Sequence, residues 1–436
     1  MQKNSACIIN YGCQMNEYES STVSKMLEAA GFTMVKNPDQ AELVLLNTCT
    51  VRDQADEKVW NRLDNLIPQK RKFKAKKVAV LGCMVEAQRD AFLKRYPQID
   101  LLLSPAQLKN IGTELEQVTN RNFDSYESYE YVHEANSSLF KSYLPIQTGC
   151  NFNCTYCIVP AVKGREVNHS PETLLNKVNS LVRSGVREVT LLGQTINSYR
   201  WEKTRFADLL ESLASNYPST WFRFLTSHPV LFDLRIIDVM SRYKNLCPFV
   251  HIPAQSGSDR ILRSMKRGYT ASKYLDLINT IREKIPGVCI STDMICGFPG
   301  ETEEDFKQSL NLMQRVRFET AFMFFYSERK ETVAAEMQDS IPVEVRKQRL
   351  QQMIDLQMDL QSTIYQERLG NVVEVLVEGR ARRGKDFLKA RSAGNFPVFF
   401  EGDSNLIGSI QKVRLIHASS HSFKAELIPQ ERLLNA

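Results

Sequence analysis

Features that would place a protein in a membrane or outside the cell are missing from this sequence. No apolar run approaches 18 residues, so no membrane-spanning helix is predicted. The N-terminal segment MQKNSACIIN lacks the apolar stretch of a secretory signal, and we therefore expect a cytoplasmic protein. No segment repeats with a period of 20 to 50 residues, which argues against a solenoid.

The sequence also has little net charge. Its 56 basic and 50 acidic residues leave a charge of +6 over 436 residues, which permits a nucleic-acid partner without establishing one. With 43% apolar residues, the chain is long enough for two or three domains with their own cores. Ten cysteines without a secretion signal argue against a disulfide framework and favour metal binding or chemistry.

The first part of the chain alternates apolar runs with helical patterns. Strands are expected at 6–12, 41–47, 76–82 and 99–105. Helices are expected at 19–30, 54–67 and 86–95. Buried apolar strands that alternate with helices indicate a parallel α/β sheet.

One cysteine follows each of the first three predicted strands, namely Cys13, Cys49 and Cys83. Ligands of open α/β sheets gather in the crevice beyond the carboxyl ends of the strands. The three thiols are therefore predicted to converge at one point. Free cysteine is also a common core residue, so three unrelated buried thiols are the alternative.

A second α/β pattern follows residues 120–142, which are polar and aromatic and read as a linker. Its strands are expected at 143–147, 186–193, 221–226, 249–253, 288–295 and 320–326. Six such units are too few for a closed eight-stranded barrel and indicate a partial (β/α)6 barrel, with its site at the carboxyl ends of the strands. Polar residues stand at those ends: Gln194, Ser227, Gln255, Asp293 and Ser327.

The C-terminal part begins with a long amphipathic helix, expected at 341–369. About five short strands follow and fit a small β-barrel of the kind that binds oligonucleotides. A basic loop lies between its first two strands and contains Arg380, Arg382, Arg383 and Lys385. This loop is either a solvated hairpin or a contact for RNA phosphates.

A second group of cysteines lies in the segment TGCNFNCTYC, directly after a predicted strand. It is a C-x3-C-x2-C triplet formed by Cys150, Cys154 and Cys157. Structural zinc usually takes four ligands, and no partner CxxC or HxxxH motif is nearby. Iron–sulfur cubanes usually take four thiolates, so a triplet leaves one iron open. An open iron can chelate S-adenosylmethionine, and one electron then releases a 5′-deoxyadenosyl radical, which favours the radical S-adenosylmethionine superfamily over zinc.

Over nearly its whole length the sequence resembles the radical methylthiotransferase family. The resemblance rests on GCQMNEYES, NTCTVRDQADEKV, TGCNFNCTYCIVP, LLGQTINSY, RFLTSHP, HIPAQSGSDRILRSMKRGYT and STDMICGFPGETEEDF. It implies an N-terminal methylthiotransferase domain at 1–120, a radical S-adenosylmethionine core with a linker helix at 136–369, and a TRAM RNA-binding domain at 370–434. The segment GCQMN resembles the branch that acts on tRNA carrying N6-isopentenyladenosine, rather than the branches with GCKVN or GCPKN.

The resemblance also implies two [4Fe-4S] clusters. The cluster that cleaves S-adenosylmethionine would be held by Cys150, Cys154 and Cys157. An auxiliary cluster, whose free iron carries the extra sulfur, would be held by Cys13, Cys49 and Cys83. Contacts to S-adenosylmethionine are expected from Gly193, Gln194, Arg223, Gln255 and Asp293. The alternative for these last residues is a structural role at the strand ends.

The implied reaction is methylthiolation of C2 of N6-isopentenyladenosine at position 37 of tRNA. One S-adenosylmethionine would methylate the sulfur and a second would supply the radical, because C2 bears an unactivated hydrogen that no general base removes usefully. The expected partners are a tRNA anticodon stem-loop, whose bases can be splayed out, and an electron donor such as flavodoxin or ferredoxin. We expect a monomer without membrane attachment.

Two alternatives to this function remain open. The same chemistry could act on threonylcarbamoyladenosine tRNA or on a ribosomal protein, and a non-catalytic zinc protein that binds RNA is the alternative from another class. Two loops depart from the family pattern and bear on substrate contacts. Lys330 and Glu331 replace the Pro-Gly of YSxRPGT, and KGREVNHS, with Lys163, Asn168 and His169, replaces RGxExSR.

Overall fold

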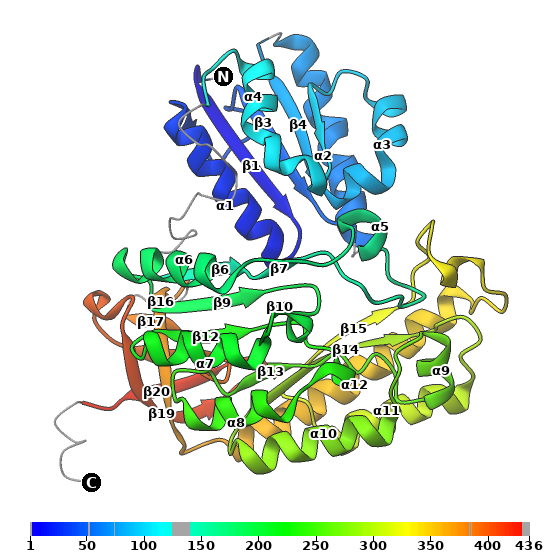
Figure 1. Cartoon of the computed structure of the whole chain (residues 1–436), viewed down its shortest axis with the longest axis vertical. Coiled ribbons are helices and arrows are strands. Elements are labelled where there is room, and N and C mark those ends of the chain that lie inside the picture. Colours follow the sequence, from blue (N-terminus) through cyan, green and yellow to red (C-terminus); the bar gives the residue numbers. More distant parts are fainter. Residues whose placement is uncertain are drawn as a thin grey trace.

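The computed structural model describes residues 2–50, 53–73, 75–123, 140–382, 384 and 386–429. An N-terminal α/β domain, a partial barrel and a small closed β-barrel follow one another along the chain (Figure 1). The predicted fold class is therefore confirmed. Most of the segment predicted as a linker at 120–142 lies outside the described residues, as do Arg383 and Lys385 of the basic loop.

The N-terminal domain is built around a five-stranded parallel sheet in the order β2-β1-β3-β4-β5. Its strands are β1 (Ser5–Tyr11), β2 (Thr33–Met34), β3 (Leu43–Thr48), β4 (Lys77–Gly82) and β5 (Leu101–Leu103). Its helices are α1 (Gln14–Ala29), α2 (Asp53–Lys72), α3 (Cys83–Arg95), η1 (Pro105–Asn110) and α4 (Ile111–Thr119). Every residue of β3 is buried, as a central strand covered on both faces requires. The two-residue strand β2 was not expected, because so short a run has no detectable period.

The partial barrel contains six parallel strands in two hydrogen-bonded groups, β12-β9-β6 and β13-β14-β15. A parallel bridge between Phe222 and Leu246 joins the groups. The strands are β6 (Lys141–Pro145), β9 (Glu188–Leu192), β12 (Trp221–Phe224), β13 (Phe249–His251), β14 (Cys289–Cys296) and β15 (Thr320–Phe325). All six coincide with predicted strands, so the partial (β/α)6 architecture is confirmed.

Helices cover the outside of this barrel. They are α6 (Pro171–Arg183), α7 (Phe206–Asn216), α8 (Leu234–Arg242), α9 (Asp259–Ser264), α10 (Ala271–Lys284) and α11 (Glu303–Val316). The short helix α5 (Val159–Lys163) packs instead against α3 of the N-terminal domain. Side-chain caps define where several of them begin: Ser170 accepts from the Thr173 amide at α6, and Thr302 accepts from the Asp305 amide at α11. Short elements in the loops are β7 (Gln147–Thr148), β8 (Val167–Asn168), η3 (Ile196–Ser198), β10 (Arg200–Trp201), β11 (Thr204–Arg205), η4 (Pro229–Leu231) and η5 (Val333–Glu336).

Helix α12 (Val343–Glu367) leads into a closed five-stranded barrel in the order β16-β17-β18-β20-β19. Its elements are β16 (Val372–Arg380), β17 (Phe387–Ser392), β18 (Pro397–Glu401), η6 (Ser404–Leu406), β19 (Ile410–Ala418) and β20 (Phe423–Leu427). Closure leaves no strand edge exposed, as expected for this type of barrel.

The small barrel packs against the strand starts of the partial barrel, at the left of Figure 1. Phe249 at the start of β13 and Cys289 at the start of β14 share a core with Val375 and Phe396. The N-terminal domain lies on another side, where α1 packs against β6 and α3 against α5 (Figure 1). The small barrel therefore does not cover the carboxyl ends of the barrel strands, which face the N-terminal domain and the loops.

The four cysteines outside the two predicted groups are all buried, namely Cys7, Cys247, Cys289 and Cys296. Burial raises the pKa of Cys247, Cys289 and Cys296 to about 12, so these thiols stay protonated at neutral pH. All ten cysteines of the chain are free of disulfides.

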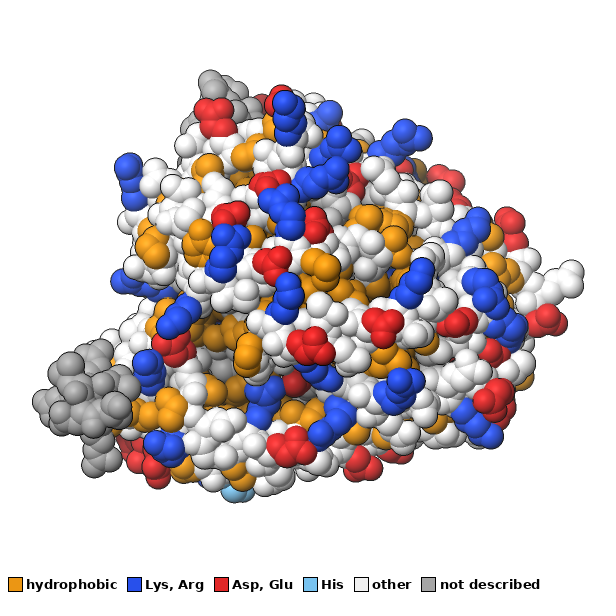
Figure 2. Space-filling model, turned by 60° about the horizontal axis from the view of Figure 1, so that its bottom comes forward, with side chains coloured by type: hydrophobic (Ala, Val, Ile, Leu, Met, Phe, Trp, Pro, Cys, Tyr) orange, Lys and Arg blue, Asp and Glu red, His pale blue; other side chains and the backbone are white. Residues whose placement is uncertain are grey.

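The surface carries mixed charge. Figure 2 shows Lys and Arg side chains interspersed with Asp and Glu over one face of the molecule, in keeping with the small net charge. Within the described residues, no helix combines the length and apolar character needed to cross a bilayer.

Candidate active site

Cys13 and Cys83 each stand at the start of a helix. Cys13 caps α1, and its backbone N–H donates to Oδ1 of Asn16 over 3.1 Å. Cys83 is the first residue of α3 and follows Gly82, which has φ +102°. A Cβ at Gly82 would lie 2.2 Å from the carbonyl oxygen of Thr48, so only glycine fits there. Helix N-termini stabilise negative charge, which suits thiolate ligands.

Electrostatics show that the three early cysteines lie together. A hydrogen bond from Cys49 lowers the pKa of Cys13 to about 6, so Cys13 is a thiolate at neutral pH. Burial raises the pKa of Cys83 to about 12, and the charge on Cys13 contributes to that rise. Cys13 thus neighbours Cys49 and lies within electrostatic reach of Cys83, in keeping with the predicted convergence, and the role of the three as one ligand set stays a prediction.

The later cysteines lie on the loop between β7 and α5. Hydroxyl Oγ1 of Thr195 lies 3.5 Å from Sγ of Cys150, and the guanidinium of Arg267 donates to Sγ of Cys154 over 3.3 Å. The Cys157 amide donates to the carbonyl of Cys154 over 3.1 Å, which closes the turn. Burial raises the pKa of Cys157 to about 12, with contributions from the charges of Cys154 and Cys150.

The two groups of cysteines face a shared boundary. Ile158 and Val162, which follow Cys157 along the loop and α5, pack directly on Cys83. Lys163, at the end of α5, forms an ion pair with Glu19 of α1, with 3.3 Å between Nζ and Oε1. A second ion pair across the boundary joins Arg329 to Asp56 over 3.6 Å.

Within the described residues, no three His, Cys, Asp or Glu side chains are grouped at the spacing of a single metal ion. The fit of iron–sulfur clusters therefore rests on donor chemistry and loop geometry. Six thiols supply the donor type that such clusters take, three on the strand-end loops of the N-terminal sheet and three on one loop of the barrel.

Buried polar atoms without partners gather where the barrel strands end. They belong to residues that follow β6, β9, β12 and β13, namely Oε1 of Gln147, Oε1 of Gln194, Oγ of Ser227, Nε2 of His228 and Oε1 of Gln255. Native proteins leave few buried polar atoms unpaired, so this concentration indicates a polar ligand. Gln255 also has φ +66°, a conformation that is strained for a non-glycine residue. These residues suit the amino acid and ribose groups of S-adenosylmethionine.

Gly193 and Asp293 also border this region. A Cβ at Gly193 would lie 2.6 Å from Oε1 of Gln147, so the backbone approaches that side chain as closely as glycine permits. Oδ2 of Asp293 lies 3.4 Å from Nε2 of His251. Contacts from Gly193, Gln194, Gln255 and Asp293 to S-adenosylmethionine stay predictions.

The prediction for Arg223 needs correction, because its guanidinium is engaged elsewhere. It pairs with Glu188 over 3.0 Å and donates to the carbonyl oxygens of Ala393 and Ser392 over 2.7 and 3.3 Å. These partners lie at the start of β9 and in the small barrel. Arg223 is therefore a junction residue between domains rather than a cofactor contact.

Sequence reasoning gave no role to Arg267, Lys163 or His228, although each lies inside a quoted motif or a noted departure. His228 stacks on Phe152, with 4.1 Å between ring centroids. Burial, with help from Arg267, lowers the pKa of His228 to about 3, so its ring is neutral. The only sequence signal for Arg267 was its position in MKRGYT, which does not reveal a contact to a cysteine 113 residues away.

One departure from the family pattern lies in the loop after β15, and the other runs from the end of α5 through the short strand β8. Glu331 occupies a glycine position of that pattern and has φ +71°, where a glycine would be free of strain. Both Lys330 and Glu331 are exposed. Nδ2 of Asn168 donates to Oε1 of Glu166 over 2.9 Å, and the carbonyl of His169 accepts from the Tyr199 hydroxyl over 2.8 Å.

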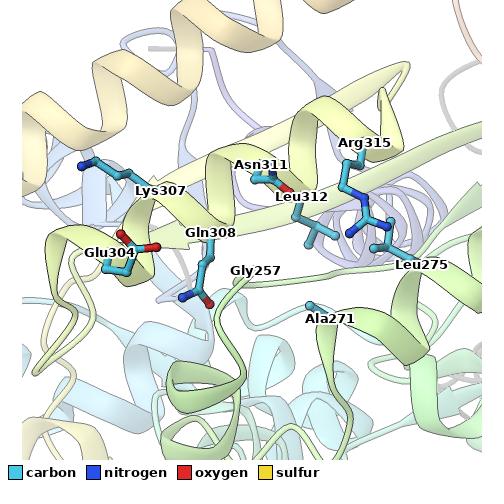
Figure 3. Close-up of a pocket in the computed structure, with 9 residues that line it drawn as sticks. All are labelled: Gly257, Ala271, Leu275, Glu304, Lys307, Gln308, Asn311, Leu312 and Arg315. Carbon is cyan, nitrogen blue, oxygen red and sulfur yellow. The ribbon is translucent and has the colours of Figure 1, made fainter.

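Two cavities accompany these features. One of about 330 Å³ adjoins the loop of the later cysteines and is lined by Asn151, Phe152, Glu166, Ser198, Arg200 and Leu231. The other, of about 380 Å³, lies between α10 and α11, where Figure 3 shows Lys307, Gln308 and Arg315 opposite Ala271 and Leu275. The candidate active site is marked by cysteines and unpaired buried polar atoms. The lining residues of the second cavity include neither, so this cavity is not part of the site.

Three families match consecutive parts of the chain. Residues 5–104 match "Uncharacterized protein family UPF0004", residues 144–313 match the radical SAM superfamily, and residues 366–428 match the TRAM domain. The chain is 38% identical over 432 residues to a tRNA-2-methylthio-N(6)-dimethylallyladenosine synthase of Chlorobium chlorochromatii, covering 96% of each protein. It is 39% identical over 443 residues to the synthase of that name in Porphyromonas gingivalis, covering 98% of this chain and 96% of the relative.

A solved structure shares the fold at low sequence identity. The radical S-adenosylmethionine methyltransferase TsrM from Kitasatospora setae, with cobalamin and a [4Fe-4S] cluster bound, aligns with a TM-score of 0.57 over 77% of each chain. At 14% identity, this likeness concerns the fold alone.

Proposed function

The chain belongs to the radical S-adenosylmethionine tRNA methylthiotransferases, and from that membership we propose that it methylthiolates C2 of N6-isopentenyladenosine at position 37 of tRNA. The enzyme class is that of a tRNA methylthiotransferase, and S-adenosylmethionine and [4Fe-4S] clusters are the cofactors of this family. The names of the full-length relatives support the choice of the isopentenyladenosine substrate.

Two cysteine trios on facing loops are the observation that carries the proposal. Cys150, Cys154 and Cys157 would hold the radical-generating cluster. The auxiliary cluster would be held by Cys13, Cys49 and Cys83. When bound, these groups and two molecules of S-adenosylmethionine supply an electron, a methyl group, a hydrogen-abstracting carbon radical and a sulfur atom.

The protein's own residues bind, orient and shield these groups. Arg267, buried and fixed by the carbonyl of Pro253 and the hydroxyl of Tyr269, directs its guanidinium at Sγ of Cys154. The unpaired oxygens of Gln194 and Gln255 would accept from the amino or hydroxyl groups of S-adenosylmethionine. The neutral ring of His228, stacked on Phe152, would offer its unpaired Nε2 to the ligand, and the stacked pair would help to keep water from a reactive radical.

The substrate base would enter from an anticodon loop, since an unpaired loop base can be splayed out into an active site, whereas a stacked and paired base cannot. The small barrel would add affinity for phosphates through its basic loop, of which Arg380 and Arg382 are described and exposed. An electron donor such as flavodoxin or ferredoxin would reduce the clusters, and the enzyme would act as a monomer.

The experiment that tests this function is nucleoside mass spectrometry of tRNA from a strain that lacks the gene. We expect the 2-methylthio form of N6-isopentenyladenosine to disappear and unmodified N6-isopentenyladenosine to accumulate. Complementation with the wild-type chain should restore the modification, whereas the C13A and C154A chains should not. Unchanged methylthiolated adenosines would refute the proposal, and loss confined to threonylcarbamoyladenosine would assign the enzyme to that substrate.

A further inference from the structure

Lys163 crosses from the radical domain into the N-terminal domain beside the early cysteines. It ends helix α5, six residues after Cys157, and its side chain is only 11% exposed. Its Nζ lies 3.3 Å from Oε1 of Glu19, a carboxylate that is 8% exposed. Sequence reasoning noted Lys163 only as a departure from a family pattern, and the proposed chemistry does not use it.

The partner of Lys163 belongs to a buried polar network that reaches Cys13. Oε2 of Glu19 accepts from Nδ2 of Asn16 over 3.3 Å and from Nδ2 of Asn47 over 3.4 Å. Nδ2 of Asn16 also donates to Oδ1 of Asn47 over 2.8 Å. Oδ1 of Asn16 in turn accepts from the backbone N–H of Cys13 over 3.1 Å and lies 3.3 Å from its Sγ. One continuous chain of contacts therefore links Lys163 to the first of the early cysteines.

The charge of Lys163 acts on more than its ion-pair partner. Burial works to lower the pKa of Lys163, but the charges of Glu19, Cys83 and Cys13 outweigh that effect and raise the pKa. Conversely, Lys163 works to lower the pKa of both Cys13 and Cys83. A fixed cation thus lies within electrostatic reach of two of the three thiols, in a site where few water molecules screen it.

We propose that Lys163 is a positioning residue for the sulfur-carrying group: through Glu19, Asn16 and Asn47 it fixes Cys13, and its charge sets how readily the group bound to the early cysteines is reduced. The inference rests on the proposed assignment of an iron–sulfur cluster to Cys13, Cys49 and Cys83. Because α5 directly follows the loop of the later cysteines, the same contact fixes the two cysteine loops relative to each other.

The test uses full-length protein in which Cys150, Cys154 and Cys157 are replaced by Ala, so that only the auxiliary cluster is reconstituted. Its reduction potential and the EPR spectrum of its reduced form are then compared among variants of Lys163 and Glu19. K163M removes a positive charge and should shift the potential to more negative values. E19Q removes a negative charge and should shift it to more positive values, while K163R should keep the parent potential.

Opposite signs separate an electrostatic role from a purely structural one, because loss of packing would not reverse direction between K163M and E19Q. K70M is the matched control, since Lys70 of α2 also pairs with a carboxylate, Asp100, but near the starts of β4 and β5 rather than at the carboxyl ends, where the early cysteines lie, and it should leave the potential unchanged. If K163M fails to retain iron, E19Q and K163R carry the test alone.

Different results would refute the cluster assignment and the role of Lys163. Absence of about four irons from the parent variant would overturn the cluster assignment itself. Retention of iron with K163M and E19Q both at the parent potential, or both shifted in one direction, would overturn the role of Lys163 and leave the assignment standing.

Discussion

Arg223 and Glu188 form a buried ion pair, with 3.0 Å between Nη2 and Oε2, at the junction of the two barrels. Both side chains are 3% exposed. The same guanidinium donates to two carbonyl oxygens of the small barrel, at Ser392 and Ala393. Arg223 therefore ties the small barrel to the starts of the barrel strands, away from the end at which the cysteines gather.

Removing Arg223 should destabilise the protein without weakening cofactor binding. R223M leaves the Glu188 carboxylate buried without its main partner, and we expect a loss of about 3–5 kcal/mol in the free energy of unfolding. Denaturant unfolding followed by circular dichroism measures this loss. The double variant E188Q/R223M should recover part of it, because no unpaired charge remains. Unchanged stability together with a reduced affinity for S-adenosylmethionine would instead indicate that Arg223 contacts the cofactor.

The pKa values of the early cysteines predict selective alkylation of cluster-free protein. Cys13, with a pKa lowered to about 6 by Cys49, is a thiolate at pH 7.5, whereas Cys83, with a pKa raised to about 12 by burial, is not. Iodoacetamide should therefore modify Cys13 at least about tenfold faster. The rate at Cys13 should fall as the pH falls through about 6, as its thiolate is lost. Peptide mapping by mass spectrometry measures the labelling rate of each cysteine and its dependence on pH. Equal labelling of the two cysteines would contradict the difference between their pKa values.

Gln255 provides the sharpest test of the S-adenosylmethionine site. Its buried Oε1 has no partner, so a hydrogen bond gained from the ligand would contribute about 1–1.5 kcal/mol. Q255A should accordingly raise the dissociation constant for S-adenosylmethionine about tenfold in equilibrium binding. Q357A is the matched control, since Gln357 on α12 also has a buried, unpaired Oε1. Equal effects of the two substitutions would point to general destabilisation rather than to a ligand contact.

The basic loop of the small barrel predicts salt-dependent binding of tRNA. R380E should weaken binding of an anticodon stem-loop and reduce the slope of log affinity against log salt by about one, because one phosphate contact is lost. R315E makes the same charge change at an exposed position on α11 and should have little effect. Binding titrations at several salt concentrations distinguish the two. If both variants weaken tRNA binding equally, the effect comes from the net charge of the protein and not from a phosphate contact of the basic loop.

The sequence was informative wherever a function depends on spacing along one strand or loop. Cys150, Cys154 and Cys157 share a single loop, and one cysteine follows each of three parallel strands, so topology alone brings each trio together. The direction of a side chain within a strand is harder to predict. Arg223 lies on a barrel strand, as expected, but its guanidinium points to the starts of the strands and to the small barrel.

Contacts between domains were beyond sequence reasoning. Lys163 and Glu19 are 144 residues apart, and neither belongs to a pattern that predicts a partner. The same holds for Arg329 and Asp56. Such pairs depend on how finished domains dock, which hydrophobic periodicity and motif spacing do not describe.

The central claim is that the chain holds two iron–sulfur clusters, one on each cysteine trio. Its most direct test is the iron and acid-labile sulfide content of anaerobically reconstituted full-length protein, compared between wild type and C13A. The account predicts about eight irons per chain in the wild type and about four in C13A. About four irons in both proteins, or about eight in both, would contradict it.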